Sequence, residues 1–233
     1  MDAILRDLIA IPSITGDAAA SQQIIDYATH FLQKRGMHVH TFNKAGFPSL
    51  VATSRATKHP KVLLAAHLDV VAAPPEMFQL RLENGTYYGR GVWDMKYAAA
   101  AYLHLIDEIQ ATLHTYDIGI MFTSDEEIYG EYGTGYQMRE YGLRPQVAIL
   151  PDAIQPWHIQ QTGKGCYFGE VSVIGISAHG SRPWEGDSAS IKLIHILQQV
   201  ADLFKNDQQA HTKTLNISML PITSAAPALV SRV

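Results

Sequence analysis

The stretch LLAAHLDVV, residues 63–71, decides the fold of this 233-residue chain. It is almost wholly apolar and predicts a strand buried on both faces, as in the core of a parallel sheet. His67 and Asp69 nevertheless lie within it. Because residues two apart along a strand point to the same side, we expect the imidazole and the carboxylate to lie together where water is scarce.

On either side of this stretch, predicted strands alternate with predicted helices. A first helix is expected to end before Pro12, and further helices are expected over 17–36 and 95–110. Asn84-Gly85 predicts a hairpin turn. The alternation predicts an α/β fold in which helices flank a mixed, mainly parallel sheet. The strands are expected at 37–42, 49–54, 61–71, 117–124 and 146–150.

The composition changes after residue 162, and this change indicates a second, smaller domain. Residues 162–187 are rich in glycine, 188–204 have the spacing of an amphipathic helix, and 213–222 predict a strand. We therefore expect a larger domain over 1–162 and a smaller α+β domain over 163–233.

Composition and charge exclude several classes of function. The net charge is −4 and no run rich in Lys or Arg occurs, so neither nucleic acid nor a membrane surface is an expected partner. No apolar run approaches the roughly 20 residues that span a bilayer. Cys166 is the single cysteine, which excludes a disulfide within the chain and favours a reducing, cytoplasmic location.

Acidic residues follow the predicted buried strands at their carboxyl ends, which is where open α/β sheets bind ligands. Carboxylates gathered at one edge repel one another and raise their own pKa values. A divalent cation removes this repulsion, and histidine together with carboxylate suits zinc. The sequence therefore predicts a metal site. Its candidate residues are His67, Asp69, Asp94, Asp125, Glu126, Glu127 and Asp152.

The chemistry also suggests how the candidates divide their roles. Asp69 can orient the imidazole of His67 and raise its basicity. Of the adjacent Glu126 and Glu127, one can bind metal while the other serves as a general base. Taken singly, each residue has a simpler explanation: His67 can be structural, and Asp94 can cap a helix. Their joint placement at strand ends favours the site.

At these residues the chain resembles the co-catalytic zinc amidohydrolases, which include acetylornithine deacetylases, succinyl-diaminopimelate desuccinylases, aminoacylases, glutamate carboxypeptidases and dipeptidases. The matching motifs occur in the family's order and cover nearly the whole chain. They are HLDVV (67–71), YYGRGVWDMK (87–96), TSDEEIYGEYGT (123–134), PD (151–152), GKG (163–165) and GISAHGSRP (175–183). The resemblance implies a zinc-exopeptidase-like fold with a lid or dimerisation domain.

The resemblance also implies a role for each site residue. It implies two divalent metal ions, with zinc expected and cobalt or manganese as alternatives. Glu126 resembles the general base, and Asp69 resembles the residue that orients His67. His179 resembles a histidine that stabilises the tetrahedral intermediate, commonly in the site of a partner subunit, so a homodimer is implied. The implied metal ligands are His67 and Asp152 for one ion, Glu127 for the other and Asp94 as the bridge.

The chain departs from the family's pattern in three places. Tyr97 follows Lys96 where family members have glycine. Asp152 stands where many deacylases have glutamate, although dipeptidase-like branches also use aspartate. The family's catalytic domain resumes after the small domain and supplies a late histidine to the second metal. Neither His195 nor His211 matches that ligand, so the second site is expected to be incomplete in this chain.

The expected function is metal-dependent hydrolysis of the amide bond in an N-acyl amino acid or a small peptide, with Glu126 as general base. A first alternative is a catalytically silent remnant of such an enzyme that binds metal or dimerises. A second is an α/β binding protein whose acids hold a cationic ligand without hydrolysis. Metal content and turnover together distinguish the three.

Overall fold

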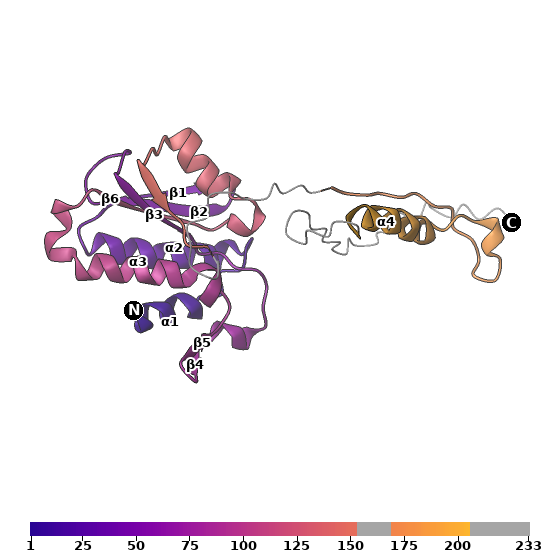
Figure 1. Ribbon diagram of the computed structural model, residues 1–233, viewed down its shortest axis with the longest axis horizontal. Helices are drawn as coiled ribbons and strands as arrows, with labels where there is room; N and C mark the ends of the chain where they lie inside the picture. Colours follow the sequence, from indigo (N-terminus) through magenta and orange to yellow (C-terminus); the bar gives the residue numbers. More distant parts are fainter. Residues whose placement is uncertain (153–168, 206–233) are drawn as a thin grey trace. The chain divides into compact units, whose positions relative to one another are not determined.

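The computed structural model describes residues 1–152 and 169–205 (Figure 1). The chain divides into two compact units, Met1–His158 and Ile159–Val233. The domain boundary predicted at 162/163 lies outside the described residues, so it stays a prediction.

A five-stranded mixed sheet with the order β1-β2-β6-β3-β7 forms the centre of the first unit. The pairs β1–β2 and β2–β6 are antiparallel, whereas β6–β3 and β3–β7 are parallel. This confirms the predicted mixed α/β fold. The strands are β1 (His38–Lys44), β2 (Phe47–Thr53), β3 (Val62–His67), β6 (Ile118–Thr123) and β7 (Val147–Ile149).

Helices cover one face of this sheet, as Figure 1 shows. They are α2 (Ala18–Gln33) and α3 (Tyr97–Glu108), while α1 (Asp2–Ala10) packs against α3. The larger apolar core joins them to Leu64 and Ala66 of β3. On the opposite face Leu63 and Ala65 pack with Leu143, next to the short helical segments η5 (Glu131–Gly135) and η6 (Gln137–Tyr141). β3 is therefore buried on both sides, as its apolar sequence predicts.

Strand β3 ends earlier than the sequence predicts. It leaves the ladder after His67, although the amide of Leu68 still donates to the carbonyl of Thr123 at 2.8 Å. Val70 then pairs with the loop after α1, through its amide to Ser13 at 3.0 Å and its carbonyl to the amide of Thr15 at 3.0 Å. Asp69, between these two points, accepts the hydroxyl of Thr15 in that loop at 2.9 Å.

The connections follow the expected turn chemistry. Strands β4 (Arg81–Glu83) and β5 (Thr86–Tyr88) form the predicted hairpin. Asn84 and Gly85 make its turn with φ values of 50° and 78°, a left-handed conformation that these two residue types accept most readily. The remaining short helical segments are η1 (Pro75–Phe78), η2 (Val92–Lys96), η3 (Gln110–Thr115), η4 (Glu126–Ile128) and, in the second unit, η7 (Pro183–Glu185).

In the second unit, the predicted amphipathic helix is confirmed as α4 (Ala189–Lys205). Before it, Ile176 and Asp187 form an isolated antiparallel bridge. The predicted strand 213–222, the GKG motif, Cys166 and His211 lie outside the described residues. Within the described ranges, no helix is both long and apolar enough to cross a membrane.

A lysine lies at the centre of the packing between α1 and η2. Lys96 is fully buried, and its ammonium group donates to the carbonyls of Leu8 at 3.0 Å and Ile11 at 2.9 Å. These carbonyls lie at the end of α1, where helical partners run out. Burial lowers the pKa of Lys96 to about 7, although the charge of Asp69 opposes this shift. Lys96 therefore fixes α1 to the segment that carries Asp94.

We predict that Lys96→Met lowers the free energy of unfolding by about 2 kcal/mol, because two buried carbonyls lose their donor. The difference in free energy of unfolding between wild type and Lys96→Met should grow as the pH rises from 7 to 9. Between pH 7 and 9 Lys96 is protonated in the unfolded chain but largely deprotonated in the folded chain. The free energy of unfolding of the wild type therefore rises by up to about 1.4 kcal/mol per pH unit, and that of the variant does not. Urea unfolding at both pH values measures this.

Lys34→Met is the matched control, because Lys34 is exposed at the end of α2 and its replacement should change stability little. Equal unfolding curves for wild type and Lys96→Met at pH 9 would contradict the role given to Lys96.

Candidate metal centre

Three parallel strands bring the predicted site residues to one edge of the sheet. His67 is the last residue of β3 and is paired with Thr123, the last residue of β6. Glu126 and Glu127 follow β6 after Ser124 and Asp125, and Asp152 comes shortly after β7, which runs parallel to β3. The carboxyl ends of all three strands therefore face the same side, as expected for a ligand site in an open α/β sheet.

Side chains of His67, Asp94 and Glu127 converge at this edge. One ligand atom from each lies within 4.8 Å of the other two. The Nε2 atom of His67 lies 2.9 Å from Oδ1 of Asp94 and 3.8 Å from Oε2 of Glu126. His67 is 2% exposed, whereas the side chains of Asp94 and Glu126 are each 50% exposed. The group thus has a buried imidazole at its base and carboxylates open to solvent.

The electrostatic field around His67 is strongly negative. Burial acts to lower the pKa of the imidazole, but a hydrogen bond to Asp69 and the charges of Asp69, Glu126 and Asp94 outweigh it and raise the pKa to about 9. The Nδ1 atom lies 3.0 Å from the main-chain carbonyl of Asp69 and 3.5 Å from its carboxylate. A cation at Nε2 is favoured by the same field.

Burial and neighbouring charges disfavour the ionised forms of both glutamates at this edge. Burial raises the pKa of Glu126, and the charges of Asp152, Glu127 and Asp69 add to the shift while that of His67 opposes it. Burial and the charge of Asp94 likewise raise the pKa of Glu127, although the amide of Val71 donates to it.

Asp152 lies within the same field. Burial raises the pKa of its carboxyl group, as do the charge of Asp94 and a hydrogen bond to that residue, while the charge of His67 acts in the opposite direction. Asp152 is not among the three residues of the tight group, but its interactions place it beside Asp94 and His67.

Asp69 organises the glutamates, a role that the sequence did not reveal. Its carboxylate is fully buried and accepts the amides of Glu126 and Glu127, each at 3.2 Å. It also accepts the hydroxyl of Thr15 at 2.9 Å. The sequence predicted only that Asp69 orients His67. Thr15 was missed because a single threonine after a helix carries no distinguishing signal.

The loop after β6 is held by a second buried acid. Asp125 is fully buried and accepts the amides of Tyr132 at 2.7 Å and Gly133 at 2.9 Å. Tyr129 has a φ of 85°, a backbone conformation that residues other than glycine rarely adopt. Such strain persists only where the surroundings enforce it. Asp69 and Asp125 together fix the loop that carries Glu126 and Glu127.

Asp94 is delivered by the segment that precedes α3. Its backbone is extended, with φ −128° and ψ 100°, and the peptide bond to Met95 is cis. Gly91 begins this segment with a φ of 81°, and a Cβ atom there would lie 2.8 Å from Cγ1 of Val70. The close approach to Val70 brings Asp94 over the end of β3.

His179 lies in the second unit, where it is exposed and its Nδ1 atom is 2.8 Å from the hydroxyl of Ser181. Its predicted role in the site stays a prediction.

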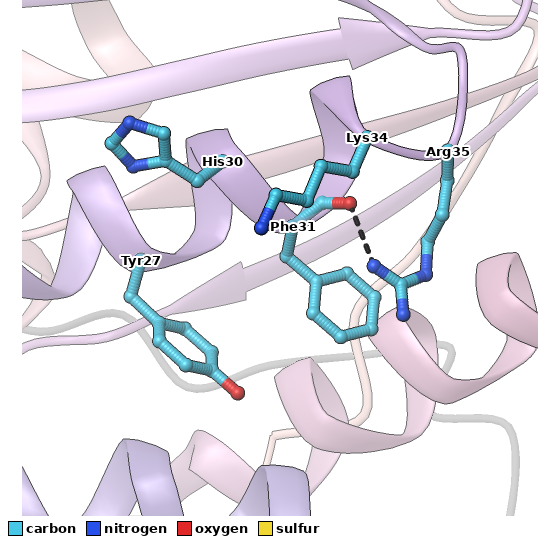
Figure 2. A pocket seen from close by; sticks show the side chains of 5 residues that line it. All are labelled: Tyr27, His30, Phe31, Lys34 and Arg35. Carbon is cyan, nitrogen blue, oxygen red and sulfur yellow. Dashed lines mark hydrogen bonds between the residues drawn. The ribbon is translucent and has the colours of Figure 1, made fainter.

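A hollow of about 290 Å³ on α2 is separate from this site. Figure 2 shows that it is lined by Tyr27, His30, Phe31, Lys34 and Arg35. Arg35 pairs there with Asp107, near the end of α3, whereas Asp94 lies just before the start of α3. A 12-residue helix is about 18 Å long, so the hollow lies at the far end of α3 from the acids.

The residues at the sheet edge fit a divalent metal. One imidazole and several carboxylates form a donor set that suits zinc, cobalt or manganese. Burial and the charges of neighbouring carboxylates raise the pKa values of Glu126, Glu127 and Asp152, so their ionised forms are disfavoured while no cation is bound. A bound cation supplies that charge.

The chain belongs to the peptidase family M20/M25/M40, whose model matches residues 63–225. This range begins in β3 and includes every predicted site residue.

Relatives in the family include two desuccinylases. The chain is 28% identical over 224 residues to succinyl-diaminopimelate desuccinylase from Nitratiruptor sp., covering 88% of this chain and 58% of the relative. It is 33% identical over 156 residues to a putative succinyl-diaminopimelate desuccinylase from Mycobacterium tuberculosis, covering 66% of this chain and 43% of the relative. The chain spans about half the length of these curated relatives.

Solved structures support the same fold. Human carnosine dipeptidase 1 matches with a TM-score of 0.54 and 19% identity, covering 65% of this chain and 38% of that protein. The M20 family metallo-carboxypeptidase Sso-CP2 from Sulfolobus solfataricus matches with a TM-score of 0.50 and 20% identity, covering 63% and 36%.

We predict that Gly133→Ala displaces the loop that carries Glu126 and Glu127. An added Cβ atom would overlap Oδ1 of Asp125 and lie 2.8 Å from Cβ of Thr123, both in the buried interior. The free energy of unfolding should fall by about 1–3 kcal/mol, as for other overpacked sites, and zinc affinity should fall with it. Chemical unfolding and zinc titration measure the two effects.

Gly135→Ala is the control for this loop. A Cβ atom there would meet the far end of the Arg139 side chain, which is 63% exposed and can shift, and would lie 3.2 Å from the carbonyl oxygen of Gly130. If Gly133→Ala and Gly135→Ala behave alike, the packing around Asp125 does not position the glutamates.

Proposed function

We propose that the chain is the metal-binding part of a hydrolase that cleaves amide bonds. The convergence of His67, Asp94 and Glu127 within 4.8 Å, beside the half-exposed carboxylate of Glu126, carries this proposal. Membership of the peptidase family M20/M25/M40 supports it.

The ligands that we propose are those whose donor atoms face one another at the sheet edge. His67 and Asp152 would hold one ion, Glu127 would hold the other, and Asp94 would lie between the two. Asp94 suits the bridging role because it contacts His67 and also interacts with both Glu127 and Asp152. When bound, zinc, cobalt or manganese acidifies water and polarises the substrate carbonyl.

Glu126 is the proposed general base. Its carboxylate lies 3.8 Å from Nε2 of His67 and outside the tight group, so it is available to accept a proton. Burial raises the pKa of Glu126, which makes its carboxylate a better proton acceptor. In the proposed reaction water attacks the amide carbonyl while Glu126 takes its proton. Glu126 then gives that proton to the amine nitrogen as the C–N bond breaks.

The proposed substrate is an N-acyl amino acid or a small peptide. The relatives' names support this class, because they describe desuccinylases, a dipeptidase and a carboxypeptidase. Each of these activities opens an amide bond. We also propose that the second unit serves as a lid or dimerisation domain and that His179 stabilises the oxyanion, as the family resemblance implies.

We predict that Glu126→Gln lowers hydrolysis by about 10²–10⁴-fold while zinc content stays unchanged, because the amide cannot accept the proton of water. The assay measures release of free amine from N-succinyl and N-acetyl amino acids and dipeptides, and elemental analysis measures zinc. Glu131→Gln is the control, because Glu131 is 64% exposed and pairs with Arg139.

Two outcomes of this experiment separate the alternatives. Undiminished turnover in Glu126→Gln removes Glu126 from the mechanism. Bound zinc without turnover in the wild-type chain favours the silent, metal-binding alternative.

A further inference from the structure

Two tyrosines of α3 hold the segment that leads to Asp152. The hydroxyl of Tyr102 donates to the carbonyl of Ile149 at 3.1 Å, and the hydroxyl of Tyr97 donates to the carbonyl of Pro151. The two bonds thus reach carbonyls on either side of Leu150. Because α3 packs on the central sheet, it offers a rigid support for this segment.

The two hydrogen bonds differ in what they can fix. Strand β7 pairs with β3 from Val147 to Ile149, so the carbonyl that Tyr102 contacts belongs to a residue already held in the ladder. Pro151 lies beyond the last paired residue. Tyr97 therefore acts where the strand ladder no longer constrains the chain, one residue before Asp152.

Tyr97 also contacts the other side of the site. It is the first residue of α3, three residues after Asp94, and its ring stacks on Trp93 with centroids 6.1 Å apart and planes inclined by 23°. Burial raises the pKa of Tyr97, and the charges of Asp152 and Asp94 raise it further. The shift favours the protonated phenol, the form that donates the hydrogen bond to the carbonyl of Pro151.

We infer that Tyr97 is a positioning residue that links the segment of Asp94 to that of Asp152 and sets the distance between their carboxylates. The inference rests on the proposed function, in which both residues hold metal. Tyr97 stands where the resembling family has glycine, so this link is a feature of this chain. In this role Tyr97 acts through the position of Asp152.

The test compares Tyr97→Phe with Tyr102→Phe in the 233-residue chain. Each variant removes one phenol oxygen from the same helix and frees one carbonyl of the same segment. Zinc affinity is measured by titration against a competing chelator, and folding is checked by thermal unfolding. Tyr97→Phe is expected to weaken zinc binding by about 10-fold, as for other residues that orient ligands, whereas Tyr102→Phe should leave it unchanged.

A double-mutant cycle with Asp152→Ala provides a readout that a purely structural role would not change. Once Asp152 is absent, Tyr97→Phe should no longer affect zinc affinity, because the residue it positions is missing. The inference is overturned if Tyr97→Phe lowers zinc affinity equally with and without Asp152→Ala. It is also overturned if Tyr97→Phe and Tyr102→Phe lower zinc affinity equally. Unchanged affinity in Tyr97→Phe overturns it too while leaving the proposed function intact. Failure of the wild-type chain to bind zinc overturns both.

Discussion

The arrangement of the site depends on the hydrogen bonds that the buried carboxylate of Asp69 accepts. This carboxylate is completely removed from solvent, yet it accepts two main-chain amides and one hydroxyl. A buried carboxylate needs such donors, because an unpaired charge in the interior is very costly. The amides that it uses are those of Glu126 and Glu127, so satisfying Asp69 also fixes both glutamates beside His67.

This arrangement gathers several carboxylates around His67, and among the described residues no lysine or arginine is seen to pair with them. Lys96 is buried and interacts with the charge of Asp69, but it donates to the carbonyls at the end of α1, and burial lowers its pKa. His67 responds with a raised pKa, and the neighbouring carboxyl groups do the same. A fold that brings these groups together without a cation would lose stability for no gain. The excess of carboxylates around His67 thus agrees with the metal dependence of the peptidase family M20/M25/M40.

The sequence predicted those parts of the fold that depend on local pattern. The apolar run of β3, the alanine-rich helix α3 and the Asn84-Gly85 turn each have a periodicity or turn signal of their own. The convergence of His67, Asp94 and Glu127 could also be expected, because parallel strands end at one edge of the sheet. Local patterns do not reveal partners that are distant in the chain. The bonds from Thr15 to Asp69 and from Lys96 to α1 therefore became visible only in three dimensions.

Strand β3 ends earlier than predicted because a segment distant in the chain pairs with the last residues of the predicted strand. Its sequence stays apolar through Val71, and nothing in the residues themselves marks a change of partner at Leu68. The main-chain amide and carbonyl of Val70 form hydrogen bonds with the loop at Ser13–Thr15 instead of with a neighbouring strand. That exchange turns Asp69 from a strand residue into the support of the glutamate loop.

The most direct test of this account is anomalous diffraction at the zinc edge from crystals of the chain grown with zinc. The account predicts an anomalous peak within coordinating distance of Nε2 of His67 and a carboxylate oxygen of Asp94. Crystals with zinc bound elsewhere, or with the hydrogen bond between His67 and Asp94 intact and no peak between these side chains, would contradict it.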